Sequence, residues 1–389
     1  MNINNTLIAL LRSEVCGVEI VPELLRDLRT EDIAELYRLS RAHDVCHLVG
    51  SAISKCKDSL SRCELLSRFA DEHMLAVFRY RRFADELLQI SALFEDEEIE
   101  HIPLKGSVLR NYYPEAWMRT SCDIDILVRP AELDRAKVLL EEKLGYVLFA
   151  KSSHDISLNS PTGVHLELHH TLIEDGYAGY EGKLLSEVWE NTELCDGKRF
   201  TYVMTDSMFY FYHVVHMAKH LLAGGCGIKS VIDLWILENK VPHDKKKREA
   251  IISESGFYKF NDGFLRLSHV WFDGAEGDSL TDSLEEFILL GGVYGTVENG
   301  VSIDVVKRQG RLKYALSRIF PPYSSMKRMY PSLGRHKWLL PFCHVRRWLR
   351  VIFCGGLKRA GAQFSKSKNI SSAEIDRAEL LLSELGLLK

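Results

Sequence analysis

The sequence predicts an α+β fold, in which a small mixed β-sheet with flanking helices lies between an N-terminal and a C-terminal helical region. Short runs of β-branched and apolar residues, which are typical of strands, gather between residues 98 and 204. Before and after that stretch, apolar residues recur at the three- and four-residue spacing of helices. We therefore expect an N-terminal helical region over residues 1–97, an α/β core over 98–204 and a mostly helical domain over 205–389.

The N-terminal region is expected to be helical and to lack catalytic residues. Residues 31–55 and 65–94 carry apolar side chains at helical spacing. Thr30-Glu31-Asp32 is typical of a helix start, because a threonine can cap free N–H groups and acidic residues favour the first turn. The region is expected to form a platform for the core.

The middle region alternates strand and helix signals. Pro130 suits the start of a helix and Gly145 suits its end. The expected strands lie at residues 101–104, 123–128, 146–150, 154–158 and 164–169, and the expected helices at 107–113 and 131–143.

The C-terminal region is again mostly helical, with an exposed connection expected at residues 241–248. Residues 344–359 are basic and have apolar side chains interleaved. This pattern predicts a helix with its apolar face toward the core and its basic face toward solvent. Contact with anionic lipid is the alternative.

Two aspartates share one face of the strand expected at residues 123–128. Because side chains alternate along a strand, Asp123 and Asp125 point one way and the apolar residues between and after them point the other. Two neighbouring carboxylates repel each other unless a cation lies between them, and oxygen ligands suit Mg²⁺. The pair therefore predicts a divalent metal site.

A third carboxylate stands on the strand expected at residues 164–169. Glu167 shares a polar face with His165 and His169. If this strand lies beside the first, Glu167 joins the aspartates, and three such carboxylates can hold two metal ions. A zinc or iron cluster of these three residues is the rival interpretation. Otherwise His169 is expected to form hydrogen bonds at the edge of the site.

A glycine-containing turn precedes both strands. Lys105-Gly106-Ser107 follows a short apolar run and begins a helix signal. Gly106 lets backbone N–H groups approach a phosphate, and the side chains of Ser107 and Lys105 can donate to its oxygens. The turn therefore predicts a phosphate-binding loop.

Taken together, a Gly-Ser turn after a strand, Asp-x-Asp on the next strand and a later single carboxylate resemble the polymerase-β-type nucleotidyltransferase superfamily. A narrower resemblance is to a bacterial family usually labelled "uncharacterised nucleotidyltransferase". The residues that carry it are Leu104-Lys105-Gly106, Tyr113-Pro114, Arg119, Asp123-Ile124-Asp125, Gly145-Tyr146, His213 to His220, Gly227-Ile228-Lys229, Asp233, Tyr330-Pro331-Ser332, Trp338-Leu339-Leu340-Pro341 and Arg347.

The resemblance implies an enzyme that moves a nucleoside monophosphate from an NTP such as ATP to an acceptor hydroxyl and releases pyrophosphate. Asp123, Asp125 and Glu167 would be catalytic and would hold two Mg²⁺ ions, for which Mn²⁺ can substitute. The residues expected to bind the nucleotide are Lys105, Gly106, Ser107, Arg119 and Lys229. The acceptor is expected to be a small molecule, a glycan precursor or a protein side chain.

Several alternatives stay open at this stage. Lys229 and Asp233, four residues apart, also fit an ion pair within one helix. His213, His216 and His220 share a helical face, which fits packing at a domain interface or a zinc site. The whole site could instead move the γ-phosphoryl group, as a phosphotransferase does, or serve a non-catalytic module that binds a nucleotide or a partner.

Composition narrows the class of protein. A net charge of −4 and a pI near 6.4 give no overall attraction to nucleic acid. The chain has no signal-peptide pattern and no apolar run long enough for a membrane span. Nine scattered cysteines without a Cys-x-x-Cys pair are typical of reduced thiols. A cytoplasmic protein is therefore expected.

Overall fold

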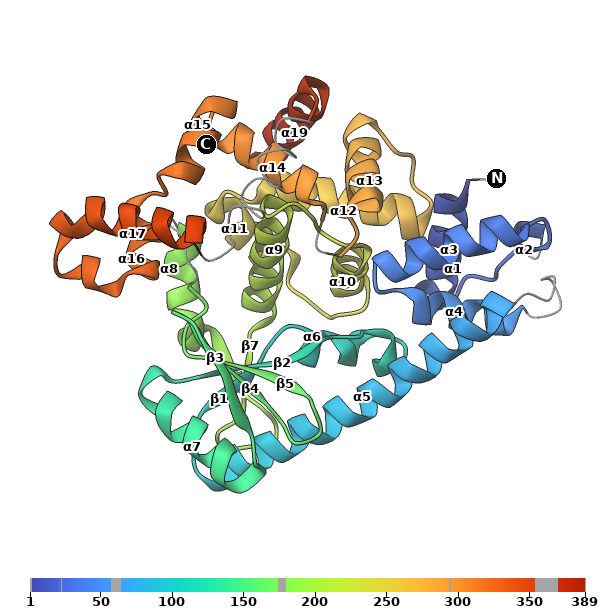
Figure 1. The fold of residues 1–389 in the computed structure, drawn as a ribbon. Helices are drawn as coiled ribbons and strands as arrows, with labels where there is room; N and C mark the ends of the chain where they lie inside the picture. The colour runs from blue at the N-terminus through green and yellow to red at the C-terminus, as the bar shows by residue number, and fades with distance from the viewer. Residues whose placement is uncertain are drawn as a thin grey trace.

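The computed structural model describes residues 2–21, 23–56, 64–173, 180–293, 295–353 and 370–388. A mixed five-stranded sheet and a small two-stranded sheet are flanked by helical regions that precede and follow them in the chain (Figure 1). The predicted α+β fold class is confirmed.

The N-terminal helices are α1 (Ile3–Cys16), α2 (Glu23–Arg26), α3 (Thr30–Ala42), α4 (Cys46–Lys55) and α5 (Glu64–Asp96). Residues 31–55 are divided between α3 and α4, because the chain turns at Asp44, whose φ of 52° is left-handed. Helix α5 runs diagonally from the other N-terminal helices to the sheet (Figure 1). It therefore joins the platform to the core.

The five-stranded sheet has the order β1-β2-β5-β4-β3. Its strands are β1 (His101–Pro103), β2 (Asp123–Val128), β3 (Val147–Lys151), β4 (Asp155–Asn159) and β5 (His165–His169). Strand β2 pairs with β5 in parallel, with Asp125 opposite Glu167, and the other pairs are antiparallel. The sequence prediction that Glu167 would lie beside the aspartate strand is therefore confirmed.

The two faces of this sheet have different surroundings. Ile124, Ile126 and Leu168 are buried in a core with side chains of α5 and of α7 (Leu133–Leu144). Alternation along the strands places Asp123, Asp125 and Glu167 on the opposite face. That face looks toward the C-terminal helices.

The remaining elements follow in chain order. They are α6 (Gly106–Leu109), α8 (Tyr180–Ser186), β6 (Thr192–Leu194), β7 (Tyr202–Met204), α9 (Asp206–Leu222), α10 (Ile228–Asn239), α11 (Lys245–Ser255), α12 (Tyr258–Asp273), α13 (Ser279–Gly291), α14 (Val297–Lys307), α15 (Arg311–Ile319), α16 (Tyr323–Met329), α17 (Leu340–Phe353) and α19 (Ser372–Glu384). One large core contains Leu7 of α1, Phe211 of α9 and Trp271 of α12. The N-terminal and C-terminal helices therefore pack together, and the proposed boundaries at residues 97 and 204 separate elements that share a core.

Two local predictions in the C-terminal region are wrong. Residues 241–248 do not form an exposed connection throughout, because α11 begins at Lys245 and Arg248 is buried in an ion pair with Asp206. The apolar face expected to pack in the core at residues 344–359 is exposed along α17. Residues 354–359 of that stretch lie outside the described residues.

Candidate functional site

A cleft of about 350 Å³ lies between the acidic face of the sheet and helices α9 and α10. Its walls bring together residues far apart in the sequence. The α/β part contributes Lys105, Gly106, Arg119, Asp123, Asp125, His154, Glu167 and His169, and the helical part contributes Tyr212, His213, His216, Lys219, His220, Lys229 and Asp233. Seven of the eight predicted site residues line it. Ser107 does not, since it is buried behind the turn.

Asp125 is the most buried carboxylate on the sheet side of the cleft. Its Oδ1 accepts hydrogen bonds from Lys105 Nζ at 2.7 Å and His169 Nε2 at 2.9 Å. Burial alone would raise the pKa of Asp125, but Lys105 and His169 hold it well below its ordinary value. Against the opposing effect of burial, Asp125 and Glu167 raise the pKa of His169 to about 9. Asp125 is therefore ionised and held between two cations.

Asp123 differs from its neighbour two residues away. Burial and the charge of Asp125 raise the pKa of Asp123 to about 6. Like charges therefore accumulate on this face of the sheet in excess of the fixed cations. Such a carboxylate is stabilised by an added divalent cation.

Among the described residues, Asp125, Glu167 and His169 form a group that could hold a metal ion, and their candidate ligand atoms lie within 4.8 Å of one another. Asp123 stands outside that set. His165 also stands outside it, since its Nδ1 lies 2.9 Å from Asn159 Oδ1. The structure thus brings Asp125, Glu167 and His169 together, and Asp123 lines the same cleft beside them.

The backbone at Lys105 is strained. Its φ of 45° and ψ of −121°, together with the hydrogen bond from Ser107 N to Leu104 O, form a type II′ turn that normally places glycine at this position. Such a conformation costs on the order of 1–3 kcal/mol in a residue with a side chain. The next residue must be small, because a Cβ on Gly106 would lie 3.1 Å from Ser121 Cβ. The turn therefore holds the Lys105 ammonium against Asp125 at an energetic cost.

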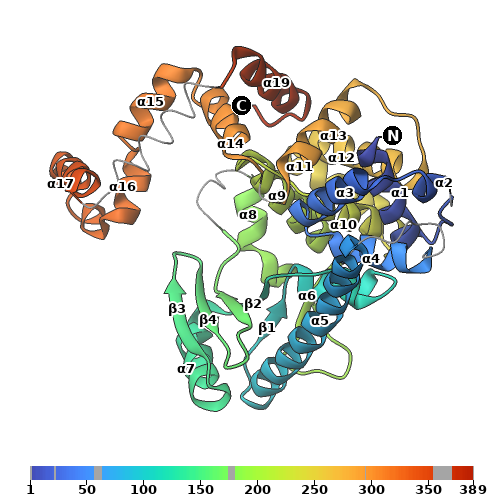
Figure 2. The same ribbon diagram turned by 45° about the vertical axis from the view of Figure 1, so that its right-hand side comes forward.

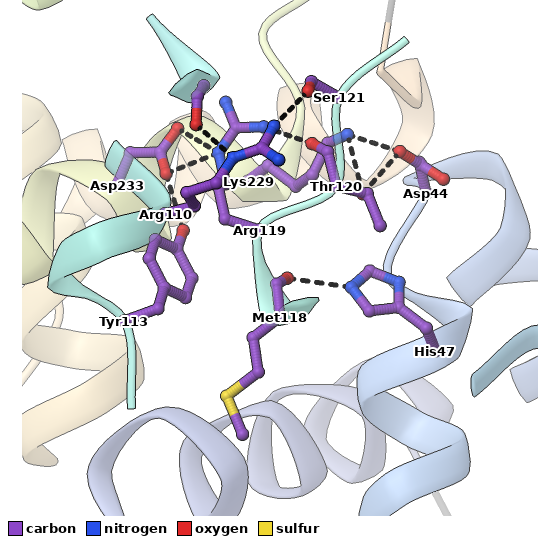
Figure 3. A network of polar contacts seen from close by, with 11 residues as sticks. Asp44, His47, Arg110, Tyr113, Met118, Arg119, Thr120, Ser121, Lys229 and Asp233 are labelled. Atoms are coloured by element: carbon purple, nitrogen blue, oxygen red, sulfur yellow. Dashed lines mark hydrogen bonds and ion pairs between the residues drawn. The ribbon is translucent and has the colours of Figure 1, made fainter. Parts of the chain in front are cut away.

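The segment Met118-Arg119-Thr120-Ser121, which leads into β2, is clamped on several sides (Figure 3). We call it the clamped segment. His47 Nε2 donates to Met118 O at 2.8 Å, and Arg110 Nη2 donates to Ser121 Oγ at 2.6 Å. Thr120 Oγ1 donates to Asp44 at 3.0 Å, and Lys229 forms an ion pair with that same carboxylate. Helices from both ends of the chain therefore fix the approach to the aspartate strand.

Arg119 of the clamped segment forms an ion pair with Asp233 of α10. Its Nε donates to both carboxylate oxygens, at 2.7 and 3.0 Å, and Tyr113 donates its hydroxyl to Oδ1 at 2.6 Å (Figure 3). The ion pair expected between Lys229 and Asp233 is therefore wrong. Asp233 pairs with Arg119, and Lys229 pairs with Asp44 near Thr120. Both side chains of α10 therefore bind to other segments and not to each other.

The three histidines of α9 line the cleft. His216 and His220 lie Nε2 to Nε2 at 3.2 Å, and burial lowers the pKa of His216 well below its ordinary value. The buried Nε2 of His213 has no hydrogen-bond partner among the described residues. Within the described ranges these histidines do not belong to a set of metal ligands. They line the wall of the cleft opposite the acidic strands.

Sequence reasoning missed Arg110, Asp44 and His47, which all hold the clamped segment. Arg110 also donates to Gly106 O at 2.8 Å, so it ties the turn to the strand entry. A buried arginine next to aromatic residues has no short sequence signature. The contacts of Asp44 and His47 span more than seventy residues, and no local pattern reports them.

Comparison with known proteins gives one family. The family described as "uncharacterised nucleotidyltransferase" matches residues 29–273. This match contains the sheet, most of the N-terminal helices and every cleft residue except Val293, and it ends at the last residue of α12. The C-terminal residues that were expected to carry the resemblance, at 330–332, 338–341 and Arg347, lie outside it. No curated protein matches the chain.

Proposed function

Because the chain belongs to the uncharacterised nucleotidyltransferase family, we propose that it transfers a nucleoside monophosphate from an NTP to an acceptor hydroxyl. The observation that carries this proposal is the register of two parallel strands. Asp125 on β2 faces Glu167 on β5, directly beside the strained Lys105-Gly106 turn. A carboxylate pair beside a phosphate-binding turn suits phosphoryl chemistry, which depends on positioning and charge neutralisation.

Divalent metal is the proposed cofactor. The ligand atoms of Asp125, Glu167 and His169 lie within 4.8 Å of one another, and burial together with the negative charges of Asp125 and Glu167 raises the pKa of Asp123 beside them. Carboxylate oxygens fit Mg²⁺, with Mn²⁺ as the alternative, and we propose Asp123, Asp125 and Glu167 as ligands, with His169 as a hydrogen-bond donor to Asp125. Bound Mg²⁺ would neutralise phosphate charge and make the acceptor hydroxyl more acidic.

The proposed reaction forms one bond and breaks one bond. The acceptor oxygen bonds to the α-phosphorus, the bond from that phosphorus to the bridging oxygen breaks, and pyrophosphate leaves. The hydroxyl proton passes to Glu167, which is less buried than Asp125 and whose carboxylate approaches His169 at 3.4 Å. Glu167 therefore serves as the proposed general base.

The nucleotide is proposed to lie between the turn and α10. Lys105 and the N–H groups at Gly106 are positioned for its phosphates, and Lys229 lines the opposite wall. Arg119 would act on the phosphates through its charge and its remaining N–H groups, since Asp233 engages its Nε and Thr120 O accepts from its Nη1. Ser107 supports the turn, since its N–H donates to Leu104 O and its side chain does not line the cleft.

Transfer of label from an α-³²P-labelled NTP to acceptors in a lysate of the producing cell tests the proposal. We expect labelled product with the wild type and none with Asp125→Asn. The exposed Asp196→Asn substitution is a matched control that should retain activity. Transfer of label only from a γ-³²P-labelled NTP would identify a phosphotransferase. Absence of transfer from both the α and the γ position would favour a non-catalytic module that binds a nucleotide or a partner.

A further inference from the structure

The net charge of the chain is only −4, but its basic and acidic residues are unevenly distributed along the sequence. Between Asp304 and Glu374 the sequence has sixteen lysines and arginines and no acidic residue. The rest of the chain carries thirty-four basic residues against all fifty-four acidic ones. One segment is therefore strongly cationic, while the remainder of the protein is strongly anionic.

Much of this cationic segment forms an extension that we call the basic arm, residues 311–353. It comprises α15, α16 and α17, which lead away from the helical body (Figure 2). The arm has a small core of its own, made of Met326, Leu333 and Cys343. It also lies beyond residue 273, where the family match ends. The arm therefore lies outside the matched part of the chain, which carries most of the cleft.

The arm exposes an apolar stripe along α17. Phe342, Val345, Leu349, Ile352 and Phe353 recur at three- and four-residue spacing, and their exposed fractions range from 48% to 79%. Such spacing places them on one side of the helix. The opposite side is anchored, because Cys343 is buried in the small core of the arm and Arg347 donates to Ile319 O at 3.3 Å and to Arg318 O at 3.1 Å. The apolar stripe of α17 therefore faces away from the rest of the basic arm.

Cations border this stripe. Arg346 and Arg350 lie on α17 next to the exposed apolar side chains, and both are exposed. Helix α15 repeats the pattern with exposed Leu312 and Leu316 beside Lys313. Exposed apolar side chains flanked by cations, with no anion in the same segment, complement a surface that is anionic outside and apolar just beneath.

We propose that the basic arm binds peripherally to the surface of an anionic phospholipid bilayer. Amphipathic helices lie in the plane of such a surface, with the apolar stripe in the acyl region and the cations at the headgroups. The acidic remainder of the protein would be repelled, so the arm alone would make contact. Within the described ranges no helix is long and apolar enough to cross a bilayer.

Nucleic acid satisfies only half of this pattern. Its phosphates would attract the cations, but a duplex offers nothing apolar to cover the stripe on α17. The bilayer accounts for both features, and it does so independently of the chemistry in the cleft.

Vesicle flotation with the full chain tests the proposal. We expect the protein to float with vesicles that contain phosphatidylglycerol and not with vesicles of phosphatidylcholine alone, and we expect high salt to release it. Arg346→Gln with Arg350→Gln should weaken binding about thirtyfold, since each cation near such a surface contributes about one kcal/mol. Leu349→Gln with Ile352→Gln should weaken it about tenfold or more.

The matched control neutralises two exposed lysines of α11, Lys246→Gln with Lys247→Gln. It removes the same charge from the body and should leave flotation unchanged. Thermal unfolding of every variant establishes that the fold is retained. Absence of flotation with anionic vesicles, unchanged flotation of the Leu349 and Ile352 variant, or tighter binding to a duplex oligonucleotide than to vesicles would each overturn the proposal.

Discussion

Two aspartates on opposite walls of the same cleft, Asp125 and Asp233, have similar burial and different surroundings. Their exposed fractions are 3% and 1%, and each accepts a hydrogen bond of 2.7 Å from a basic side chain. Asp125 stands with two further carboxylates, one of which has a raised pKa. Among the described residues, the charge of Asp233 is balanced by the Arg119 guanidinium, and Tyr113 donates its hydroxyl to the same carboxylate.

The difference shows that pairing with a cation does not by itself make a buried carboxylate structural. At Asp233 the opposite charges balance, and the arginine joins two distant segments. At Asp125 negative charge exceeds what Lys105 and His169 supply, so a divalent cation can still be accommodated. We therefore expect loss of Asp125 to affect chemistry and loss of Asp233 to affect stability.

The largest expected effect is on transfer by Asp125→Asn. Removal of one charge from the proposed metal site should lower the rate on the order of a thousandfold or more. The fold should be retained with a smaller loss of stability than at Asp233, because Asp123 and Glu167 remain near Lys105 and His169 after their direct partner has lost its charge. Transfer of α-³²P label together with thermal unfolding measures both quantities. Wild-type activity in this variant would exclude the proposed site.

The converse is expected for the Asp233 centre. Asp233→Asn leaves the Arg119 guanidinium buried without a balancing charge, which should lower the free energy of unfolding by about 3–5 kcal/mol. Denaturant unfolding measures this. In a double-mutant cycle, Arg119→Met with Asp233→Leu should lose less than the sum of the single variants. Additive losses would show that the two side chains do not interact.

Acid should affect the clamped segment and the aspartate strand in opposite ways, because the pKa of His47 is lowered and that of Asp123 is raised. Burial lowers the pKa of His47, which holds the clamped segment, to about 4. The unfolded chain then binds a proton that the folded chain does not, so stability is lost as pH falls from about 6.5 to about 4, by up to about 3 kcal/mol. Asp123, with its pKa raised to about 6, opposes this loss between about pH 6 and pH 4.

Unfolding curves across this pH range distinguish the two groups. We expect His47→Gln to reduce the loss of stability in acid and Asp123→Asn to increase it. Parallel curves for wild type and both variants would contradict both assignments.

The smallest effect expected is the stabilisation by ligand. An NTP with Mg²⁺ at about a hundred times its Kd should stabilise the fold by about 2–3 kcal/mol, because it binds only the folded state. Thermal shifts with ATP, GTP, CTP and UTP, each with and without Mg²⁺, measure it. Asp125→Asn should abolish the shift, and Asp196→Asn should retain it. A melting temperature indifferent to every combination in the wild type would count against a nucleotide site.

The amino-acid sequence by itself determined the fold class and the faces of the central strands. Alternation along 123–128 and 164–169 depends only on strand geometry, so it predicts the polar face of each strand, with Asp125 on one and Glu167 on the other. The pairing that joins these two faces came from the structure. The Lys105-Gly106 turn could also be predicted from the sequence, because the conformational freedom of glycine is a local property of the chain.

Only the tertiary structure decided which charges meet and which apolar faces remain exposed. Arg119 pairs with Asp233 and Lys229 with Asp44, over separations that helical or strand periodicity cannot report. The amphipathic pattern of α17 is the same whether its apolar side packs in a core or faces solvent, and the structure shows it facing solvent. Periodicity specifies the shape of one element, whereas its neighbours are chosen by the packing of the whole chain.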